Sequence, residues 1–354
     1  MRNLIFERSQ PVNMMFKISK AALLIVLIAF LHSCVLIAQK QQSDVFRIAF
    51  GSCNKVDLPN PFWEDMASRD PEVFFWGGDV IYADTEDMSK MQAMYAMQKS
   101  KPAYKDFIAH TEILGTWDDH DYGINDGGAN YAKKRQSQNL FLDFLDFPKD
   151  AINRKREGVY NAKTYFKSGK SIKVIVLDTR YFRTSLKASA DPDKRYEPQR
   201  TSTGTILGKE QWRWFRKELA EKTDFTIIMS SIQVLSAEHG FETWGNFPKE
   251  VKRFEKAIGR SKAMAILVLS GDRHISEFSK KKVSGLAYPL IDFTSSGLTH
   301  SYTAYDGEPN QYRVGDVVSV RSYGLVDIDL ILNEVALKII GVGGEVLGEI
   351  HQKY

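Results

Sequence analysis

The sequence is short of cysteine and of net charge. Of its 354 residues only Cys34 and Cys53 are cysteines, which excludes a disulfide-rich scaffold. The 48 basic residues nearly balance the 44 acidic ones, and no basic stripe interleaved with aromatic residues is visible. We therefore expect no nucleic-acid-binding surface. Low-complexity tracts and internal repeats are also missing, which indicates a globular chain of one large domain or two small ones.

Long apolar runs are missing as well, apart from one stretch near the N-terminus. Lys17 and Lys20 precede AALLIVLIAFL (21–31), which is too short for a comfortable membrane span and typical of a secretory signal. We therefore expect the protein to be exported. Residues 1–38 are predicted to form the signal and tether, and residues 45–354 a single folded domain.

The sequence is compatible with two cleavage sites at the end of this signal. Leu31-His32-Ser33-Cys34 resembles a bacterial lipobox, in which Cys34 is lipidated and becomes the mature N-terminus. Cleavage after Leu36-Ile37-Ala38 would instead release the protein into the periplasm. The first alternative predicts an outer-membrane or cell-surface lipoprotein that contacts the membrane through its lipid. In both cases Cys53 is the lone thiol of the domain, so no intramolecular disulfide can form.

Beyond the signal, short apolar segments alternate with amphipathic ones. The expected strands are 45–50, 73–79, 112–119, a hairpin over 160–180, 225–231, 263–272, 289–297 and several after 314. The expected helices are 61–69, 88–100, 137–147, 209–222 and 250–260. This order favours a layered α/β sandwich. The basic runs 167–173 and 279–283 are predicted to be solvated loops.

Side chains of metal-ligand type follow the ends of several expected strands. The blocks are Gly51-Ser52-Cys53, Gly78-Asp79-Val80-Ile81-Tyr82, Trp117-Asp118-Asp119-His120-Asp121 and Gly271-Asp272-Arg273-His274. Open α/β sheets build their sites at such strand ends. If the topology brings the blocks together, they could bind two metal ions that share a carboxylate, which suits phosphoryl-transfer hydrolysis. His239 and His300, which stand apart from these blocks, are predicted to be ordinary core or surface histidines.

Taken together, six blocks resemble the alkaline phosphatase D (PhoD-like) family of the calcineurin-like metallophosphoesterase superfamily. They are GSC (51–53), GGDVIYAD (77–84), TWDDHDYG (116–123), LDTRYFR (177–183), SGDRH (270–274) and FTSSGLT (293–299). The resemblance implies an αββα sandwich of two mixed β-sheets flanked by helices. It also implies that residues 45–354 form the catalytic domain of a metal-dependent phosphoric monoester or diester hydrolase.

The resemblance further implies a ligand set for one hard metal ion. Asp79 would bridge two metals, and Tyr82 matches the family's iron-binding tyrosine. Cys53 takes the place of a first-strand ligand, and His274 would bind the same ion. A thiolate and a phenolate together favour an electron-poor metal such as Fe³⁺.

The second metal would share Asp79 and would be bound by Asp119 and Asp272. In the superfamily these last two positions usually hold asparagine and histidine, so the set is richer in oxygen here. Oxygen ligands favour Ca²⁺ over Zn²⁺. The expected pair is therefore Fe³⁺ with Ca²⁺, and Zn²⁺, Mn²⁺ or Co²⁺ remain alternatives.

Three residues are expected to take part in catalysis, namely Asp119 as a ligand, His120 and Arg180. His120 would orient the phosphate and protonate the leaving oxygen. Arg180 would bind phosphate oxygens with its guanidinium fork, and its alternative role is a surface ion pair. Gln233 stands where related enzymes often have a histidine, and its role stays open.

Residues around these blocks are assigned supporting roles. Asp118, Asp121 and Asn125 are expected to support the site or its loop. The segments 183–205 and 300–315, the latter with Tyr302, Tyr305 and Tyr312, are expected to form the walls of the substrate pocket. Two other functions compete with hydrolysis: an inactive surface lipoprotein that keeps the fold as a binding module, and a Ca²⁺ protein with acidic loops. Spacing unlike that of an EF-hand counts against the latter.

Overall fold

Two β-sheets packed face to face form the centre of the domain. The computed structural model describes residues 44–201 and 203–354, so the predicted signal and tether (1–38) lies outside the described residues. The six-stranded sheet has the order β13 (Val346–Lys353), β12 (Glu334–Gly341), β11 (Ser322–Asp329), β1 (Val45–Gly51), β2 (Val73–Gly77) and β3 (Glu112–Thr116). The seven-stranded sheet has the order β10 (Arg313–Val318), β8 (Ser276–Lys281), β9 (Leu290–Ser295), β7 (Ala265–Ser270), β6 (Phe225–Met229), β5 (Lys170–Val176) and β4 (Asn161–Lys167).

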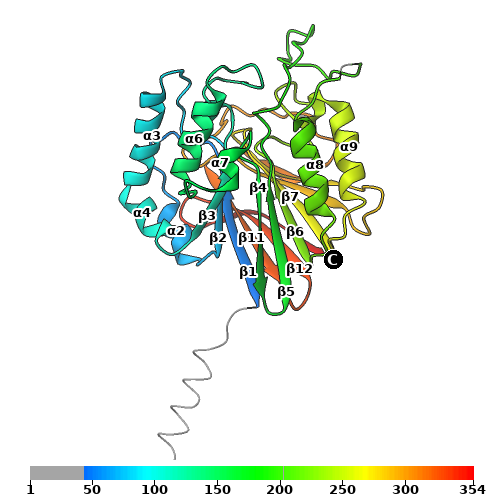
Figure 1. The fold of residues 1–354 in the computed structure, drawn as a ribbon. Helices are drawn as coiled ribbons and strands as arrows, with labels where there is room; N and C mark the ends of the chain where they lie inside the picture. Colours follow the sequence, from blue (N-terminus) through cyan, green and yellow to red (C-terminus); the bar gives the residue numbers. More distant parts are fainter. Residues whose placement is uncertain (1–43, 202) are drawn as a thin grey trace, which may run out of the picture. The chain divides into compact units, whose positions relative to one another are not determined.

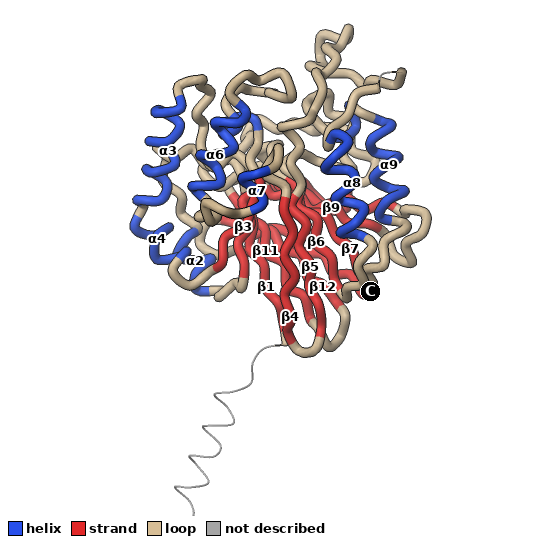
Figure 2. Tube along the Cα trace, in the orientation of Figure 1, coloured by secondary structure: helices blue, strands red, loops and turns tan. Residues whose placement is uncertain are grey.

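Helices cover the outer face of each sheet (Figures 1 and 2). The six-stranded sheet packs against α2 (Trp63–Ser68), α3 (Met88–Ser100), α4 (Pro102–Ile108) and α6 (Lys134–Phe144). The seven-stranded sheet packs against α8 (Gly208–Leu219) and α9 (Pro248–Ile258). The short helices are α5 (Asp119–Tyr122), α7 (Ile152–Lys155) and the 3₁₀ turn η1 (Trp244–Asn246). The expected αββα sandwich of two mixed sheets is therefore confirmed.

The apolar character of the strands follows from this layering. All residues of β2, VFFWG, are buried, because one face meets the second sheet and the other meets helices. Between the sheets, the rings of Phe50 and Phe293 lie 4.9 Å apart, edge to face. Each large apolar side chain buried in this way contributes about 1.5–3 kcal/mol. Within the residues that the structure describes, no helix is both long and apolar enough to cross a membrane.

Two of the sequence predictions are wrong in detail. The run 279–283 was expected to be a solvated loop, but Ser276–Lys281 is strand β8, which pairs with β9 and β10. In the run 167–173, Lys173 is buried and forms ion pairs with Glu218 and Glu221. In both runs the lysines either form ion pairs or are at least partly exposed. A hydrophilic run can therefore be a strand as well as a loop.

The parallel strands of both sheets end at one common edge, which we call the carboxyl edge. β1, β2 and β3 are parallel in one sheet, and β5, β6, β7 and β9 are parallel in the other. At this edge the sheets come so close that a Cβ atom on Gly271 would lie 2.6 Å from the carbonyl oxygen of Gly77. Glycine is therefore required at Gly271, and the loops beyond both strands meet.

Candidate metal centre

Ligand-type side chains converge at the carboxyl edge, as the strand ends predicted. Cys53 follows β1, Asp79 follows β2 and His274 follows β7, and one ligand atom from each lies within 4.8 Å of the others. The Sγ of Cys53 is 3.4 Å from Oδ2 of Asp79. The Tyr82 hydroxyl lies 3.1 Å from the same Asp79 oxygen and 3.0 Å from Nε2 of His274. These four side chains bring together a thiol, a carboxyl, an imidazole and a phenol, the donor types that were expected for the first metal.

A second group of ligand atoms adjoins the first and shares Asp79 with it. Asp79, Asp119 and His120 offer atoms within 4.8 Å of one another, and so do Asp118, Asp119 and Asp272. Asp79 thus belongs to both the Cys53 group and the Asp119 group, which is the placement expected of a bridging carboxylate. Asp118, which was expected only to support the site, is thus itself one of the grouped ligand-type side chains.

The backbone at these strand ends is in an uncommon conformation. Cys53, Asp79, Asp272 and His274 have φ angles of 62°, 52°, 71° and 55°. Residues other than glycine rarely adopt this left-handed region, and each such residue costs of order 1 kcal/mol or more. Four neighbouring residues in this conformation indicate that the fold stores strain here to aim ligand side chains at one point.

The loop that carries Asp79 is fixed by Gly78 and Asp121. Gly78 has a φ of 99°, and a Cβ atom on it would lie 2.4 Å from the Cβ of Asp118. The Asp121 carboxylate accepts hydrogen bonds from the backbone N–H groups of Asp118, Asp79 and Val80, at 2.6, 3.3 and 3.1 Å. Asp121 therefore holds two strand-end loops in register, which agrees with its expected supporting role.

Burial makes the negative charges at this site costly without a cation. It raises the pKa of Cys53 to about 11 and the pKa values of Asp79 and Asp272 well above the usual range for carboxyl groups. Although burial opposes it, the nearby charge of Arg180 lowers the pKa of Asp119. Among the described residues, Oδ1 of Asp79 is buried without a hydrogen-bond partner. An unpartnered, buried carboxylate oxygen beside a thiol, an imidazole and a phenol fits a bound metal ion.

His120 lies next to these groups and is oriented by an acidic partner. Its ring stacks on Tyr82 with centroids 4.1 Å apart. Its Nδ1 lies 2.8 Å from Oδ2 of Asp84, so this nitrogen is engaged by the carboxylate. Burial disfavours its charge, but the hydrogen bond to Asp84 and the Asp79 carboxylate outweigh this and raise the pKa of His120 to about 10. Asp84 was not singled out from the sequence, although it ends the GGDVIYAD block.

The position of Arg180 differs from the expected one. Arg180 is fully buried, and its Nε and Nη1 atoms lie 2.6 Å from Asp118 and 2.5 Å from Glu242. Glu242 also pairs with Arg183 at 2.7 Å. These ion pairs are buried, so the alternative of a surface ion pair is wrong, and among the described residues Nη2 of Arg180 has no hydrogen-bond partner. Arg180 is placed to position Asp118, and direct phosphate binding by Arg180 remains an untested prediction that its burial opposes.

His300 is a site residue that the sequence reasoning missed. It was expected to be an ordinary core or surface histidine, but its ring centroid lies 4.5 Å from that of His274 and 5.1 Å from that of Tyr82. Burial and the neighbouring His274 and Lys55 lower the pKa of His300 to about 3, which keeps it neutral. His300 comes five residues after β9 ends and directly follows FTSSGLT, so the strand-end rule extended by one residue beyond that block would have found it.

An open cleft of about 300 Å³ adjoins the two groups of ligand atoms. It is lined by Asp119, His120, Asn125, Asp126, Arg195, Phe241, Glu242, Asp272, Arg273, His274 and Tyr302. Arg195 comes from the segment 183–205 and Tyr302 from 300–315, so both expected walls contribute. Tyr305 and Tyr312 do not line this cleft; Tyr312 packs instead against the core beneath α9.

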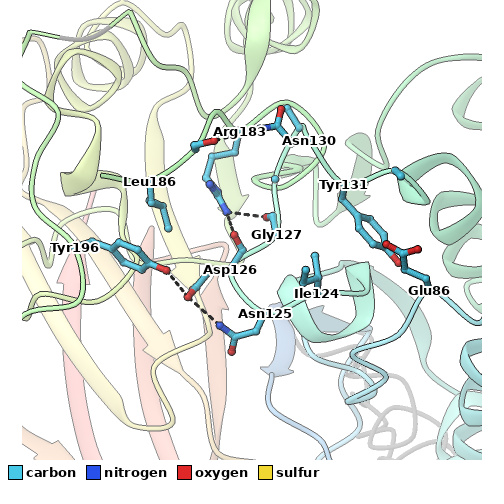
Figure 3. Close-up of a pocket in the computed structure, with 14 residues that line it drawn as sticks. Glu86, Ile124, Asn125, Asp126, Gly127, Asn130, Tyr131, Arg183, Leu186 and Tyr196 are labelled. Atoms are coloured by element: carbon cyan, nitrogen blue, oxygen red, sulfur yellow. Dashed lines mark hydrogen bonds between the residues drawn. The ribbon is translucent and has the colours of Figure 1, made fainter. Parts of the chain in front are cut away.

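A second pocket, of about 410 Å³, lies beside the cleft (Figure 3). The two share Asn125 and Asp126. In Figure 3 the Tyr196 hydroxyl and Asn125 both reach the Asp126 carboxylate, at 2.7 and 2.9 Å. The Asp126 amide donates in turn to Oδ2 of Asp119, at 2.7 Å. The wall between the pockets is therefore tied directly to a candidate ligand.

Comparison with known proteins decides the family. A sequence profile described as PhoD-like phosphatase matches residues 48–294, well over half of the chain. The chain belongs to the PhoD-like phosphatase family. The matched segment includes all six predicted ligands, from Cys53 to His274.

Two relatives of this PhoD-like chain indicate the extent of the likeness. Alkaline phosphatase D of Bacillus subtilis (strain 168) is 24% identical over 302 residues, which cover 70% of this chain and 51% of that protein. The chain therefore spans about half the length of this curated relative. A solved structure titled "Structure of PhoD" has a TM-score of 0.69 at 18% identity, covering 87% of this chain and 68% of that one.

The fold also extends to a more distant phosphatase. A crystal structure titled as a dimetal phosphatase from Danio rerio has a TM-score of 0.50 at 11% identity, covering 87% of this chain and 99% of that one. At such identities the likeness concerns the fold.

Gln233, whose role the sequence left open, is hydrogen-bonded to two buried residues of the seven-stranded sheet. Its Nε2 donates to Glu277 at 2.7 Å and to Thr294 at 2.9 Å. Gln233 is buried with both partners, so a structural role in the seven-stranded sheet accounts for it.

Proposed function

We propose that this chain is an exported, metal-dependent hydrolase of phosphoric monoesters or diesters. The observation that carries the proposal is the sharing of Asp79 between two groups of ligand atoms at the carboxyl edge. Every position that the family resemblance assigns to a ligand holds a competent donor, and the cleft beside these donors is open. A binding module that had lost activity would have no need to retain a complete and strained ligand set.

The donor chemistry supports different metals in the two groups. Cys53, Tyr82, His274 and Asp79 would hold Fe³⁺, since thiolate and phenolate ligands favour it. Asp79, Asp119 and Asp272 would hold Ca²⁺, with Zn²⁺, Mn²⁺ or Co²⁺ as alternatives. When bound, such a centre supplies Lewis acidity at the phosphoryl group and lowers the pKa of a water molecule.

The side chains around the ligands would orient the ester and handle a proton. Asp84 accepts from Nδ1–H of His120, and the raised pKa of His120 keeps its ring protonated, so that Nε2 carries an N–H as well. His120 would hold the phosphate through this N–H and deliver its proton to the leaving oxygen. Arg180 would act through Asp118, by keeping its carboxylate in place. The Asp119 carboxylate accepts hydrogen bonds from the backbone N–H groups of His120 and Asp126, which would fix its orientation as a ligand.

The proposed location is outside the cytoplasm. The basic and apolar pattern of residues 17–31 supports export, and Cys34 would carry the lipid of a surface or outer-membrane lipoprotein. Cys34→Ala separates this from soluble secretion: the variant should lose detergent-phase partitioning. A Cys34→Ala protein that still partitions like wild type would reject the lipid anchor.

Metal analysis combined with ester hydrolysis tests the function. The purified protein should contain metal and should hydrolyse p-nitrophenyl phosphate, its bis-ester, or both. Asp79→Asn should abolish metal binding and hydrolysis together. Asp70→Asn is a matched control, because Asp70 is exposed and has a similar φ of 51° but lies away from the ligands.

Two results would decide against the proposal. Full activity of Asp79→Asn would show that the site has been misassigned. A folded protein that binds metal but hydrolyses neither ester would favour the alternative of an inactive surface module.

A further inference from the structure

The edge of the sheets opposite the metal site has properties that hydrolysis does not explain. We call it the amino edge, because the parallel strands begin there. It consists of the start of β1 at residues 44–45 and the turns 69–72, 167–170, 220–224, 259–264, 282–289 and 330–333, together with Lys353 and Tyr354. In Figure 1 the start of β1 and the turn between β4 and β5 lie at the lower end of the sheets.

Hydrogen bonds connect these turns into one continuous rim. Asp44 accepts from the Leu330 N–H at 3.0 Å and from the Ser168 hydroxyl at 2.5 Å, which joins two hairpin turns at the start of β1. Further along, Asp224 accepts from the Ser171 N–H at 2.9 Å. The Met264 N–H donates to the carbonyl of Thr223, again at 2.9 Å, so the next turn is connected too.

Large apolar side chains are exposed on this rim. Phe166 is 80% exposed at the β4–β5 hairpin, and Ile331 and Leu332 are 63% and 59% exposed in the β11–β12 turn. Both hairpins contact Asp44, so the three side chains belong to neighbouring segments. Single exposed apolar residues are ordinary, but several of the most exposed ones gathered on adjacent turns indicate a surface that is covered in use.

Unpaired positive charges accompany the apolar tips. Exposed basic residues of the rim that have no ion pair among the described residues are Lys222, Arg260, Lys262, Lys282 and Lys353. Most acidic groups there are neutralised, as Glu72 is by Lys167 and Asp224 by Lys170. Asp44, Asp70 and Asp329 lack ion pairs in the described part of the chain, and Glu334 pairs only with His351, so the five unpaired cations exceed the unpaired anions by a small margin.

The predicted tether joins the domain at this same rim. Asp44 stands ten positions after Cys34 and thirteen after the end of the apolar run 21–31. Ten residues span at most about 35 Å when fully extended. A lipid on Cys34, or the apolar run itself, would therefore hold the amino edge close to a bilayer.

We propose that the amino edge is a docking surface for an anionic lipid bilayer. Phe166, Ile331 and Leu332 would enter the interface, and the unpaired lysines would face headgroup phosphates. Apolar tips flanked by basic side chains are the combination that holds proteins on anionic membranes. β1 runs for seven residues between the two edges, about 23 Å, so the docked domain would present its metal cleft to the aqueous side.

A second copy of the chain is the competing occupant of this surface. A symmetric pair would bring the unpaired lysines and Arg260 of both copies together, and like charges at an interface oppose association. An anionic bilayer instead complements both the charge and the apolar tips. The inference does not depend on hydrolytic activity, so it can fail or succeed independently of the proposed function.

Site-specific fluorescence in vesicles tests the proposal on the full chain. Phe166→Cys is combined with Cys34→Ser in a chain that keeps the apolar run 21–31 as its membrane anchor, and it is labelled with a fluorophore, since the remaining Cys53 is fully buried. The labelled protein is reconstituted into phosphatidylethanolamine–phosphatidylglycerol vesicles that contain a lipid-borne quencher. Val342→Cys is the matched control, because Val342 is half exposed at the other end of β12.

We expect quenching at position 166 to exceed quenching at position 342 several-fold. Lys222→Glu with Lys262→Glu should weaken docking by at least roughly 25-fold, since the loss of each lysine near an anionic surface removes about a fivefold factor and each new carboxylate adds repulsion. Lys209→Glu with Lys249→Glu, at the starts of α8 and α9, is the matched reversal and should leave the quenching unchanged.

Three outcomes would overturn the proposal. The first is equal quenching at both positions in anionic vesicles. The second is quenching at position 166 that persists unchanged in pure phosphatidylcholine and after both lysine reversals. The third is shielding of the label at position 166 that rises with protein concentration without vesicles, which would assign the surface to a second copy.

Discussion

Replacing Arg180 with methionine probes the buried ion network behind the metal site. Arg180 is fully buried between Asp118 at 2.6 Å and Glu242 at 2.5 Å. Arg180→Met keeps much of the side-chain volume but leaves the buried Asp118 carboxylate without its cation and Glu242 with Arg183 alone. Breaking a buried ion pair by removing one partner costs about 3–5 kcal/mol. That is a large fraction of the roughly 5–15 kcal/mol by which folded domains are stable.

Urea unfolding, followed by tryptophan fluorescence, measures this loss. With an unfolding slope of about 3 kcal/mol per M, the midpoint should fall by roughly 1–1.7 M urea. Arg213→Met is the matched control, because the Arg213–Glu210 pair lies on the surface of α8 with both side chains more than half exposed. Exposed pairs contribute at most about 1 kcal/mol, so this midpoint should hardly move.

The reasoning is refuted if the Arg180→Met midpoint is as close to wild type as that of Arg213→Met. Adding Asp118→Asn to Arg180→Met should recover part of the loss, since it removes the buried negative charge that Arg180 had neutralised. Arg180→Lys distinguishes positioning from direct phosphate contact. We expect its stability and its ester hydrolysis to fall together, whereas a residue that only contacts substrate would lose hydrolysis with an unchanged urea midpoint.

Three further perturbations test the site and its surroundings. Asp84→Asn removes the carboxylate beside Nδ1 of His120 and should lower kcat by roughly 10–100-fold with metal content unchanged; an unaltered kcat would remove Asp84 from the mechanism. His239 accepts the Phe241 N–H at Nδ1, 3.1 Å away, and burial lowers its pKa well below 6.5. Only the unfolded chain therefore gains this proton below pH 6.5, so stability should be lost there by up to about 1.4 kcal/mol per pH unit. In urea titrations His239→Asn should flatten this slope, and equal slopes would contradict the assignment. Prolonged chelation should abolish ester hydrolysis and lower the thermal midpoint, and Fe³⁺ with Ca²⁺ should restore both; full activity after verified metal removal would rule out a metal mechanism.

The strand-end rule predicted which parts of the chain meet. Cys53, Asp79, Asp119, Asp272 and His274 were singled out because each follows an apolar strand, and all five lie at the carboxyl edge. The rule works because carboxyl ends of parallel strands share one edge of a sheet. The same rule, applied after β9, would have included His300, which was set aside because a lone histidine carries little signal.

The partners of these residues could not be predicted in the same way. Asp84 reaches His120 across 36 residues, and Glu242 reaches Arg180 across 62, through loops whose paths no periodic pattern records. Arg180 was assigned to the phosphate because it follows β5, but the position of Glu242 turns it inward. Strand β8 was missed for a related reason, since the partner of its Lys281 is Glu255 of α9, which is distant in the sequence.

The sequence by itself determined the layered α/β class, the family and the set of donors, because these follow from local apolar periodicity and from short blocks of adjacent residues. Only the tertiary structure decided that Asp79 is shared by two groups of ligand atoms and that Arg180 is buried. It alone placed the exposed tips of two hairpins beside Asp44. Each of these depends on atoms brought within a few ångströms by the packing of two sheets, and that packing is a property of the whole chain.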